Sequence, residues 1–218
     1  MLPHFPHTPP DDLLKKYLKV APSEPVARYW GCVEWFDRTC GELLDHLEKK
    51  SLSENTIVIY TTDNGWIQNP EKVNQPAPRS KLSPYEGGSR TPIMIAWPGH
   101  VTPRMDRAHL ASNIDLWPTL AALVKTPAPK NLPGIDLTDD AAVARRTSVF
   151  GEDFAHNIAD VDVPTRSLQN RWIIDGWAKL IMPDSRNRPA SQPELYDLQR
   201  DPWEKMTWRP QSPNACAS

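Results

Sequence analysis

The sequence feature that most restricts the fold is a long amphipathic segment followed closely by a short apolar run. Between residues 25 and 50, apolar side chains recur at spacings of three and four, which predicts a helix with one buried face. These positions are Val26, Tyr29, Trp30, Val33, Phe36, Cys40, Leu43, Leu44 and Leu47. The β-branched run TIVIYT, residues 56–61, then predicts a buried strand. A helix, a short loop and a buried strand form half of a βαβ unit, so this part of the chain is expected to be α/β.

The flanking segments extend this pattern. The chain contains 24 prolines, about twice the usual ~5%, and residues 1–25 are proline-rich and expected to form a loop. A second buried strand is predicted at PIMIAWPG, residues 92–99, and a helix is predicted to begin near Asp115. Residues 131–144 are expected to form another loop.

The last third of the chain has a different pattern. The segments TSVFGE, RWIID, AKLIM and ELYDLQRDP are short strands, and Asp175-Gly176 favours a hairpin between the second and third of them. We therefore predict a small antiparallel sheet after the α/β part. The expected domains are an incomplete α/β domain over residues 1–140, an antiparallel subdomain over residues 141–210 and a flexible tail over residues 211–218.

Composition excludes several classes of protein. The net charge is −2, with 25 basic and 27 acidic residues, so no basic face for nucleic acid is expected. The longest apolar runs are far below the ~18 residues of a membrane span. No signal peptide is visible, which leaves the localisation unassigned. The three cysteines, Cys32, Cys40 and Cys216, form no CxxC pair, so neither a zinc site nor a disulfide framework is expected.

Asp63 and Asn64 directly follow the first predicted strand, in the sequence DNG. Ligands of open α/β sheets bind at the carboxyl ends of strands, and carboxylate and amide oxygens suit calcium or magnesium. Asp-Asn-Gly is strong turn chemistry without any metal, and on the tripeptide alone a capped turn is favoured. Two ligands also cannot fill a shell of six or more oxygens. Both interpretations of this tripeptide stay open.

Three further side chains have a functional and an ordinary interpretation. Lys81, in SKLSPYEGGSRTP, is either a solvated lysine or a positive charge aimed at an anionic substrate oxygen. His7, in PHTP, is either a surface histidine or a hydrogen-bond donor or general acid for a leaving oxygen. For Arg90 we favour a structural role. His4 has no distinguishing context.

Taken together, these motifs resemble the sulfatase family of the alkaline phosphatase superfamily. The segments that carry the resemblance are PHTP, NTIVIYTTDNGW, SKLSPYEGGSRTPIMIAWPG, IDLWPTL and ELYDLQRDPWE, in this order. The resemblance covers nearly the whole chain but only the C-terminal part of the family fold. It implies a partial sulfatase-like sheet with flanking helices, followed by a small antiparallel C-terminal subdomain. Related phosphoester hydrolases share the pattern in outline and remain an alternative.

The resemblance also implies residue roles. Asp63 and Asn64 match two ligands of the family's divalent metal ion, usually calcium. Lys81 matches the lysine that contacts the sulfate group, and His7 matches the histidine near the bridging ester oxygen. The implied substrates are sulfate esters, commonly sulfated carbohydrates in bacteria. Members of the family are commonly periplasmic or secreted.

One part of the family's chemistry is missing from this sequence. The nucleophile, formylglycine, is made from a cysteine or serine in C/S-x-P-S/A-R. None of the three cysteines begins this motif, and SEPVAR, residues 23–28, departs from it. The resemblance places two aspartate ligands, a lysine and a histidine upstream of Met1. We therefore expect a sulfatase fragment that is inactive alone and self-associates through an exposed sheet edge, or alternatively a non-catalytic binding or assembly domain.

Overall fold

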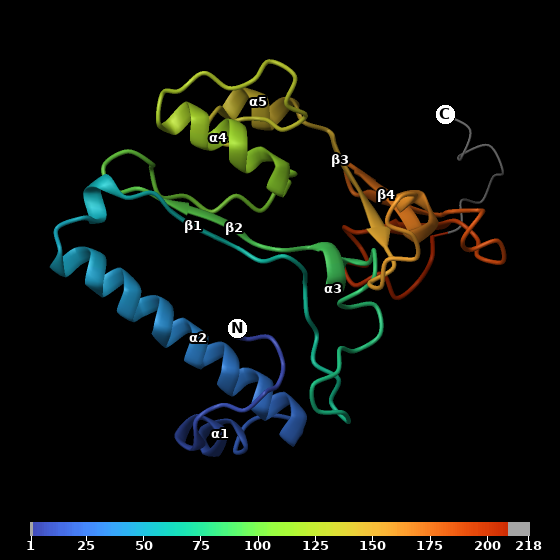
Figure 1. The fold of residues 1–218 in the computed structure, drawn as a ribbon, viewed down its shortest axis with the longest axis horizontal. Coiled ribbons are helices and arrows are strands. Elements are labelled where there is room, and N and C mark those ends of the chain that lie inside the picture. The colour runs from blue at the N-terminus through green and yellow to red at the C-terminus, as the bar shows by residue number, and fades with distance from the viewer. Residues whose placement is uncertain (1, 209–218) are drawn as a thin grey trace. The chain divides into compact units, whose positions relative to one another are not determined.

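The computed structural model describes residues 2–208, so the tail predicted at residues 211–218 and Cys216 lie outside the described residues. The chain forms two compact units, Met1–Lys81 with Gly87–Pro103, and Leu82–Glu86 with Arg104–Ser218 (Figure 1). Each unit is described by itself below. The domain boundaries predicted at residues 140 and 210 stay predictions.

The first unit begins with two helices in contact, α1 (Asp11–Tyr17) and α2 (Glu24–Lys49). The second confirms the helix predicted over residues 25–50. The first lies in a segment expected to be loop, and that expectation was wrong. Asp11 and Asp12 in its first turn and Lys15 and Lys16 in its last turn favour a short helix through the helix dipole.

Burial on α2 is confined to its N-terminal end. Its buried residues are Val26, Ala27, Gly31 and Cys32. Of the nine apolar positions that form the predicted buried face, Val26 alone belongs to this set. Leu43 is 63% exposed and Leu44 is 47% exposed. The helix was predicted correctly, whereas the burial of its apolar face was predicted wrongly for most of its length.

After a 3₁₀ turn, η1 (Ser53–Asn55), the strands β1 (Val58–Thr61) and β2 (Ile93–Ala96) pair antiparallel, with Val58 opposite Ala96 and Thr61 opposite Ile93. Both predicted strands exist, and the helix–loop–strand order predicted over residues 25–61 is confirmed. Neither strand contains a buried residue, so the expected burial was wrong. Because the pair is antiparallel, the segments after β1 and before β2 leave the sheet at the same end.

The short helix α3 (Glu86–Ser89) lies where the two units meet in the sequence. In the second unit, η2 (Asn113–Asp115) leads into α4 (Leu116–Leu123), which confirms the helix predicted near Asp115. The loop expected over residues 131–144 is wrong at its end, since α5 (Asp140–Arg145) begins there. The Asp139 side chain accepts hydrogen bonds from two backbone N–H groups and caps this helix.

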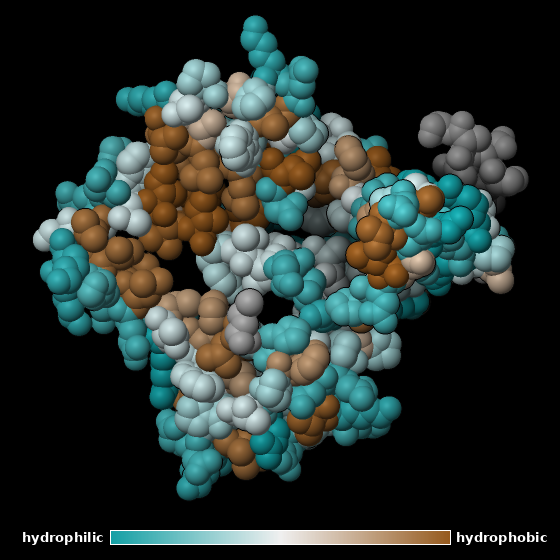
Figure 2. Space-filling view, in the orientation of Figure 1, coloured by the Kyte–Doolittle hydropathy of each residue, from teal (hydrophilic) through white to brown (hydrophobic). Residues whose placement is uncertain are grey.

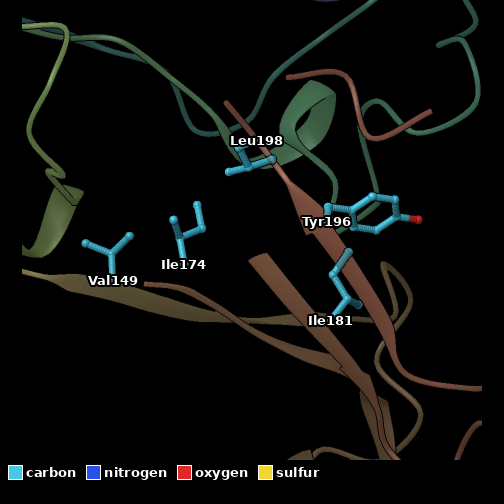
Figure 3. Packing of buried hydrophobic residues seen from close by; sticks show 5 residues of the cluster. All are labelled: Val149, Ile174, Ile181, Tyr196 and Leu198. Carbon is cyan, nitrogen blue, oxygen red and sulfur yellow. The ribbon is translucent and has the colours of Figure 1, made fainter. Parts of the chain in front are cut away.

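The predicted antiparallel subdomain is confirmed as a four-stranded sheet in the order β3-β4-β5-β6, every pair antiparallel. Gly176 has φ +56° in the turn between β4 and β5, a conformation that glycine adopts easily. The strands are β3 (Ser148–Phe154), β4 (Leu168–Asp175), β5 (Ala178–Pro183) and β6 (Glu194–Asp197), with η3 (Pro164–Ser167) before β4. The core side chains in Figure 3 are Val149, Ile174, Ile181, Tyr196 and Leu198. Among the described residues, no helix has the length and apolar character that a membrane span requires.

Candidate active site

The turn that follows β1 presents the oxygen atoms of Asp63 and Asn64. Asp63 Oδ1 accepts a hydrogen bond from the Asn64 N–H at 3.0 Å. Asn64 Nδ2 donates to the Gly65 carbonyl at 2.9 Å, which directs the amide nitrogen rather than Oδ1 into the turn. Asp63 is exposed and Asn64 is half-buried. One carboxylate oxygen and one amide oxygen therefore remain outside these hydrogen bonds.

The DNG turn lies directly against the glycine pair that precedes β2. The Gly65 N–H donates to the Gly88 carbonyl at 2.8 Å. A Cβ atom on Gly65 would lie 2.4 Å from the Gly87 carbonyl oxygen, and one on Gly87 would lie 2.5 Å from the Arg79 carbonyl oxygen. The two segments thus approach backbone to backbone, which requires residues without a Cβ atom at both positions. This contact explains why a glycine follows Asp63 and Asn64, and why glycines follow Lys81 in YEGG.

His7 is buried beside the same turn. Its side chain is enclosed, with 1% of the residue exposed, and its backbone N–H donates to Asn74 Oδ1 at 2.7 Å. The imidazole ring lies 5.3 Å from the Tyr29 ring and 5.5 Å, edge-on, from the Trp66 ring. Neither ring nitrogen has a hydrogen-bond partner among the described residues. Buried polar atoms without partners are uncommon, so the two ring nitrogens are available for hydrogen bonds to water or to a ligand.

Burial lowers the pKa of His7 below its ordinary value of 6.5. The nearby charge of His4 acts in the same direction, whereas polar groups of Pro3 and Gln68 oppose it more weakly than burial lowers it. The imidazole is therefore neutral at pH 7, with one N–H donor and one lone pair.

Lys81 also lies close to Trp66. Its Nζ atom is 5.9 Å from the centre of the Trp66 ring, within the range of a cation–π contact. The structure thus brings His7 and Lys81 to one indole, which belongs to the residue directly after DNG. Within the described part of the chain, no hydrogen bond or ion pair links Asp63 or Asn64 directly to either side chain.

Sequence analysis did not single out Trp66, the last residue of the motif TTDNGW, as a candidate site residue. Its Nε1 donates to Gln68 Oε1 at 3.3 Å, and Gln68 is itself buried. From the sequence alone, a tryptophan that follows a turn cannot be distinguished from an apolar residue that only packs in the core. The contacts with His7 and Lys81 become visible only when the three segments are brought together.

The oxygen donors at the DNG turn suit a hard divalent cation but do not complete its shell. Asp63 and Asn64 supply two ligands, whereas calcium takes six to eight oxygens. Among the residues that the structure describes, no three histidine, cysteine, aspartate or glutamate side chains are grouped to hold a metal. The residues present therefore fit part of a calcium or magnesium site.

Comparison with known proteins assigns the family. Residues 1–126 match the family model described as "Sulfatase", and residues 80–213 match the one described as "N-sulphoglucosamine sulphohydrolase, C-terminal". The chain belongs to the sulfatase family. The resemblance found in its motifs is confirmed, as is the partial sulfatase fold.

Curated relatives of this sulfatase-family chain are considerably longer. It is 31% identical over 202 residues to an N-acetylgalactosamine-6-O-sulfatase of Bacteroides thetaiotaomicron, with 81% of this chain and 37% of the relative covered. It is 32% identical over 191 residues to arylsulfatase A of Homo sapiens, with 77% of this chain and 36% of the relative covered. The chain thus spans less than two fifths of the length of either relative.

Solved structures show the same partial coverage of one fold. A structure described as "Metabolism of multiple glycosaminoglycans by bacteroides thetaiotaomicron is orchestrated by a versatile core genetic locus" matches with a TM-score of 0.75 at 22% identity, covering 95% of this chain and 48% of that one. Ps i-CgsB in complex with k-i-k-neocarrahexaose matches with a TM-score of 0.72 at 23% identity, covering 94% and 44%. At these identities the likeness shows the fold alone.

Proposed function

We propose that this chain forms part of a sulfatase that hydrolyses sulfate esters, with sulfated carbohydrates as the substrate class. The observation that carries the proposal is the contact of both His7 and Lys81 with Trp66, next to the turn that presents Asp63 and Asn64. Family membership and the relatives support it. One relative is an N-acetylgalactosamine-6-O-sulfatase, and one solved structure of the same fold is in complex with its substrate D-glucosamine-2-N,6-O-disulfate.

The chemistry of each side chain fits this role. The Lys81 ammonium supplies positive charge for the oxygens of a sulfate group. Neutral His7 retains an N–H that can donate to the bridging ester oxygen as the alcohol leaves. Burial supports this role because it keeps the imidazole neutral and excludes water around it.

Asp63 and Asn64 would hold the divalent cation of the site, with calcium the ion that suits their hard oxygen atoms. When bound, such a cation supplies charge that draws electron density from the sulfate oxygens.

With two ligands, affinity is expected to be weak, about 10⁻⁴ to 10⁻³ M. Isothermal titration of calcium into the chain measures this affinity. Asp63→Ala should abolish binding, whereas Asp45→Ala on α2 should not change it. Micromolar affinity would mean that further ligands complete the shell.

A direct test uses binding of a sulfated disaccharide in the presence of calcium, because binding does not require the nucleophile. Lys81→Gln should weaken binding at least tenfold, whereas Lys72→Gln, an exposed lysine nearby, should leave it unchanged. The unsulfated disaccharide is the control for recognition of the sulfate group. Equal binding of both sugars, or an unchanged affinity in Lys81→Gln, would contradict the proposed role. Equal affinity for the phosphorylated sugar would favour a phosphoester hydrolase instead.

A second candidate is a non-catalytic binding or assembly domain derived from the sulfatase fold. The observation in its favour is that no C/S-x-P-S/A-R motif occurs in these 218 residues. Hydrolysis through a covalent intermediate cannot proceed without a nucleophile. We expect the chain alone to show no turnover of an aryl sulfate in the presence of calcium. Turnover that disappears in Asp63→Ala would show that the chain contains a complete active site.

A further inference from the structure

The second unit contains a cleft where the segment before α4, the loop before α5 and the start of β3 meet. Its volume is about 370 Å³, at the lower end of the range for ligand pockets. Every residue that lines it belongs to the second unit. Figure 1 shows α5 beside α4 and the chain passing from α5 into β3, and in Figure 2 both hydrophobic and hydrophilic residues reach the surface in this region. Because Arg145 and Arg146 both line it, it is called the arginine cleft here.

One of the two arginines is fixed by a buried ion pair. Arg146 Nη1 donates to Asp115 Oδ2 at 2.5 Å, and its Nη2 donates to Asp115 Oδ1 at 2.9 Å. The Arg146 side chain is 10% exposed, and that of Asp115 is fully buried. The same carboxylate accepts hydrogen bonds from the backbone N–H groups of Ser112 and Ile135 at 2.8 and 2.9 Å. Asp115 thus joins the segments that line the cleft and balances the charge of Arg146.

The other arginine carries a charge without such a counter-ion. Arg145 is exposed, and among the described residues its side chain has no hydrogen bond or ion pair. The acidic side chains at the start of α5 are engaged elsewhere, since Asp139 caps the helix and Asp140 pairs with Arg104. The described residues that line the cleft include no carboxylate. The cleft therefore has a net positive charge, and the Arg145 guanidinium can bind an oxyanion through two parallel N–H donors.

The other side chains that line the cleft are apolar or carry hydroxyl groups. The apolar ones include Ile114, Ile135 and Phe150, and Phe150 is 70% exposed although it is a large aromatic residue. Thr147 and Ser148 each offer a hydroxyl group that can donate or accept a hydrogen bond. Apolar walls with a few polar groups are typical of sites that fix the orientation of a small ligand. These side chains favour a compact ligand that combines an oxyanion, hydroxyl groups and an apolar face.

We propose that the arginine cleft is a second binding site, which takes one unit of a sulfated carbohydrate. Arg145 binds the sulfate group, the hydroxyl groups of Thr147 and Ser148 bind oxygens of the sulfate or the sugar, and Phe150 packs against the C–H groups of the ring. The inference rests on the proposed function in one respect, the choice of a sulfate ester as the anion. Binding here needs no metal ion, because no residue of the DNG turn takes part. A second site of this kind raises the affinity for a polymeric substrate through multivalency.

The test measures binding of galactose 6-sulfate to the isotope-labelled chain in EDTA, from the chemical shifts of its amides. Amides of residues 145–150 report on the cleft, and amides of residues 63–68 report on the candidate active site. Arg145→Gln should weaken binding at the cleft by about tenfold or more, because charge-assisted hydrogen bonds are lost. Arg200→Gln makes the same change in net charge at a side chain that is 87% exposed, and it should leave the affinity unchanged.

Further variants and probes separate the contributions of charge, geometry and apolar contact. Arg145→Lys keeps the charge but not the planar pair of donors, and it should retain part of the affinity. Phe150→Ala should weaken binding of galactose 6-sulfate but not of inorganic sulfate. Arg145 and Phe150 are both exposed, so each variant should melt at the temperature of the wild type.

A second measurement requires no assigned spectrum. Phenylglyoxal modifies exposed arginine side chains, and mass spectrometry of the peptides identifies which ones have reacted. Galactose 6-sulfate in EDTA should slow the modification of Arg145 several-fold and leave that of Arg200 unchanged. Equal protection of both arginines, or of neither, would overturn the proposal.

The remaining outcomes are equally definite. Equal affinity for inorganic sulfate and galactose 6-sulfate would overturn the proposal, since the cleft would then hold an adventitious ion only. Equal binding of unsulfated galactose, or unchanged affinity in Arg145→Gln, would overturn the role of Arg145. Shifts at residues 63–68 alone, with calcium present, would support the proposed function and overturn the cleft as a site. Shifts at residues 145–150 alone, with calcium present, would support the cleft and count against the proposed function.

Discussion

At the scale of single residues, the site depends on two glycines that have no Cβ atom and on a buried histidine whose ring nitrogens have no hydrogen-bond partner among the described residues. Gly65 and Gly87 have no Cβ, which allows two backbone segments to lie within hydrogen-bonding distance. His7 has two buried ring nitrogens without a partner among the described residues. Glycine gives the unfolded chain more conformational freedom, which is lost on folding, and the ring nitrogens without partners leave polar atoms desolvated. Both properties therefore lower the stability of the folded chain.

The glycine contact predicts a strong difference between two alanine substitutions. Gly65→Ala would place its Cβ 2.4 Å from the Gly87 carbonyl oxygen, so the backbone must shift, and we expect a loss of about 1–3 kcal/mol in the free energy of unfolding. Gly41→Ala on α2 meets no atom within 4 Å and should stabilise by about 0.5–1 kcal/mol through helix propensity. Urea denaturation measures both. Equal effects of the two substitutions would contradict the close contact.

The lowered pKa of His7 predicts a specific pH dependence. Below pH 6.5 the unfolded chain takes up a proton at His7 that the folded chain resists, so the free energy of unfolding should fall as the pH decreases through this value. In His7→Gln, this part of the slope should disappear. The measurement is urea denaturation at pH 7.5 and 5.5, with His156→Gln, at an exposed histidine, as the control. Identical slopes in wild type and His7→Gln would contradict the burial of a neutral imidazole.

At the scale of elements, local sequence patterns predicted the helices and strands whose formation depends on residues close together in the chain. The spacing of apolar residues identified α2, and β-branched runs identified β1 and β2. The antiparallel pairing of those strands joins segments far apart in the chain, so no local pattern reports it. The burial of the α2 face likewise depends on a partner layer rather than on the helix itself. Short helices such as α5 contain too few apolar positions to show periodicity, although the cap at Asp139 was a usable signal.

For the candidate site, the order of the motifs identified Asp63, Asn64, Lys81 and His7 through family resemblance, and their roles stay predictions. Their surroundings could not be predicted from sequence. His7 and Lys81 both contact Trp66 because three segments that are distant in the chain fold together. The spacing of residues in the sequence does not indicate that these two side chains contact the same ring.

A buried charge cluster in the second unit gives a prediction at the same scale. Lys179 on β5 is fully buried, and its Nζ lies 2.9 Å from Glu86 Oε1 and 3.0 Å from Glu204 Oε1. Glu86 belongs to the YEGG motif, and its backbone N–H donates to Glu204 Oε2 at 2.5 Å. Lys179→Met should lower the free energy of unfolding by about 3–5 kcal/mol, because two carboxylates then lose their buried counter-charge.

The pH dependence of this loss has a defined sign. Burial already raises the pKa of Glu204, and removal of Lys179 should raise it further. Protonation relieves the repulsion, so the deficit of Lys179→Met should be smaller at pH 5 than at pH 8. Lys130→Met, at an exposed lysine, is the control. The triple variant Lys179→Met, Glu86→Gln, Glu204→Gln should recover part of the stability. A deficit below about 1 kcal/mol for Lys179→Met would contradict a structural role for the cluster.

At the scale of the whole molecule, apolar burial is unevenly distributed. The first unit buries Leu13, Val26, Ala27 and Cys32 at the contact of α1 with the N-terminal end of α2, and its two strands contain no buried residue. The second unit contains a core of five buried residues on and beside a four-stranded sheet. Because local stability follows buried apolar contacts, different segments of one chain are expected to open with different free energies.

Native-state hydrogen exchange should therefore show a definite order of protection. In the second unit, amides of β4 and β5 should exchange slowest, because both are central strands beside the core. In the first unit, the N-terminal half of α2 should be protected, and β1 and β2 should exchange fastest among the strands, since neither buries a side chain. Ile181→Ala and Leu13→Ala remove one core side chain from each unit and should each cost about 2–5 kcal/mol. Each should raise exchange within its own unit, in β4 and β5 for Ile181 and in α1 and α2 for Leu13. Protection of β1 and β2 equal to that of β4 and β5 in a monomeric chain would contradict the link between side-chain burial and local stability.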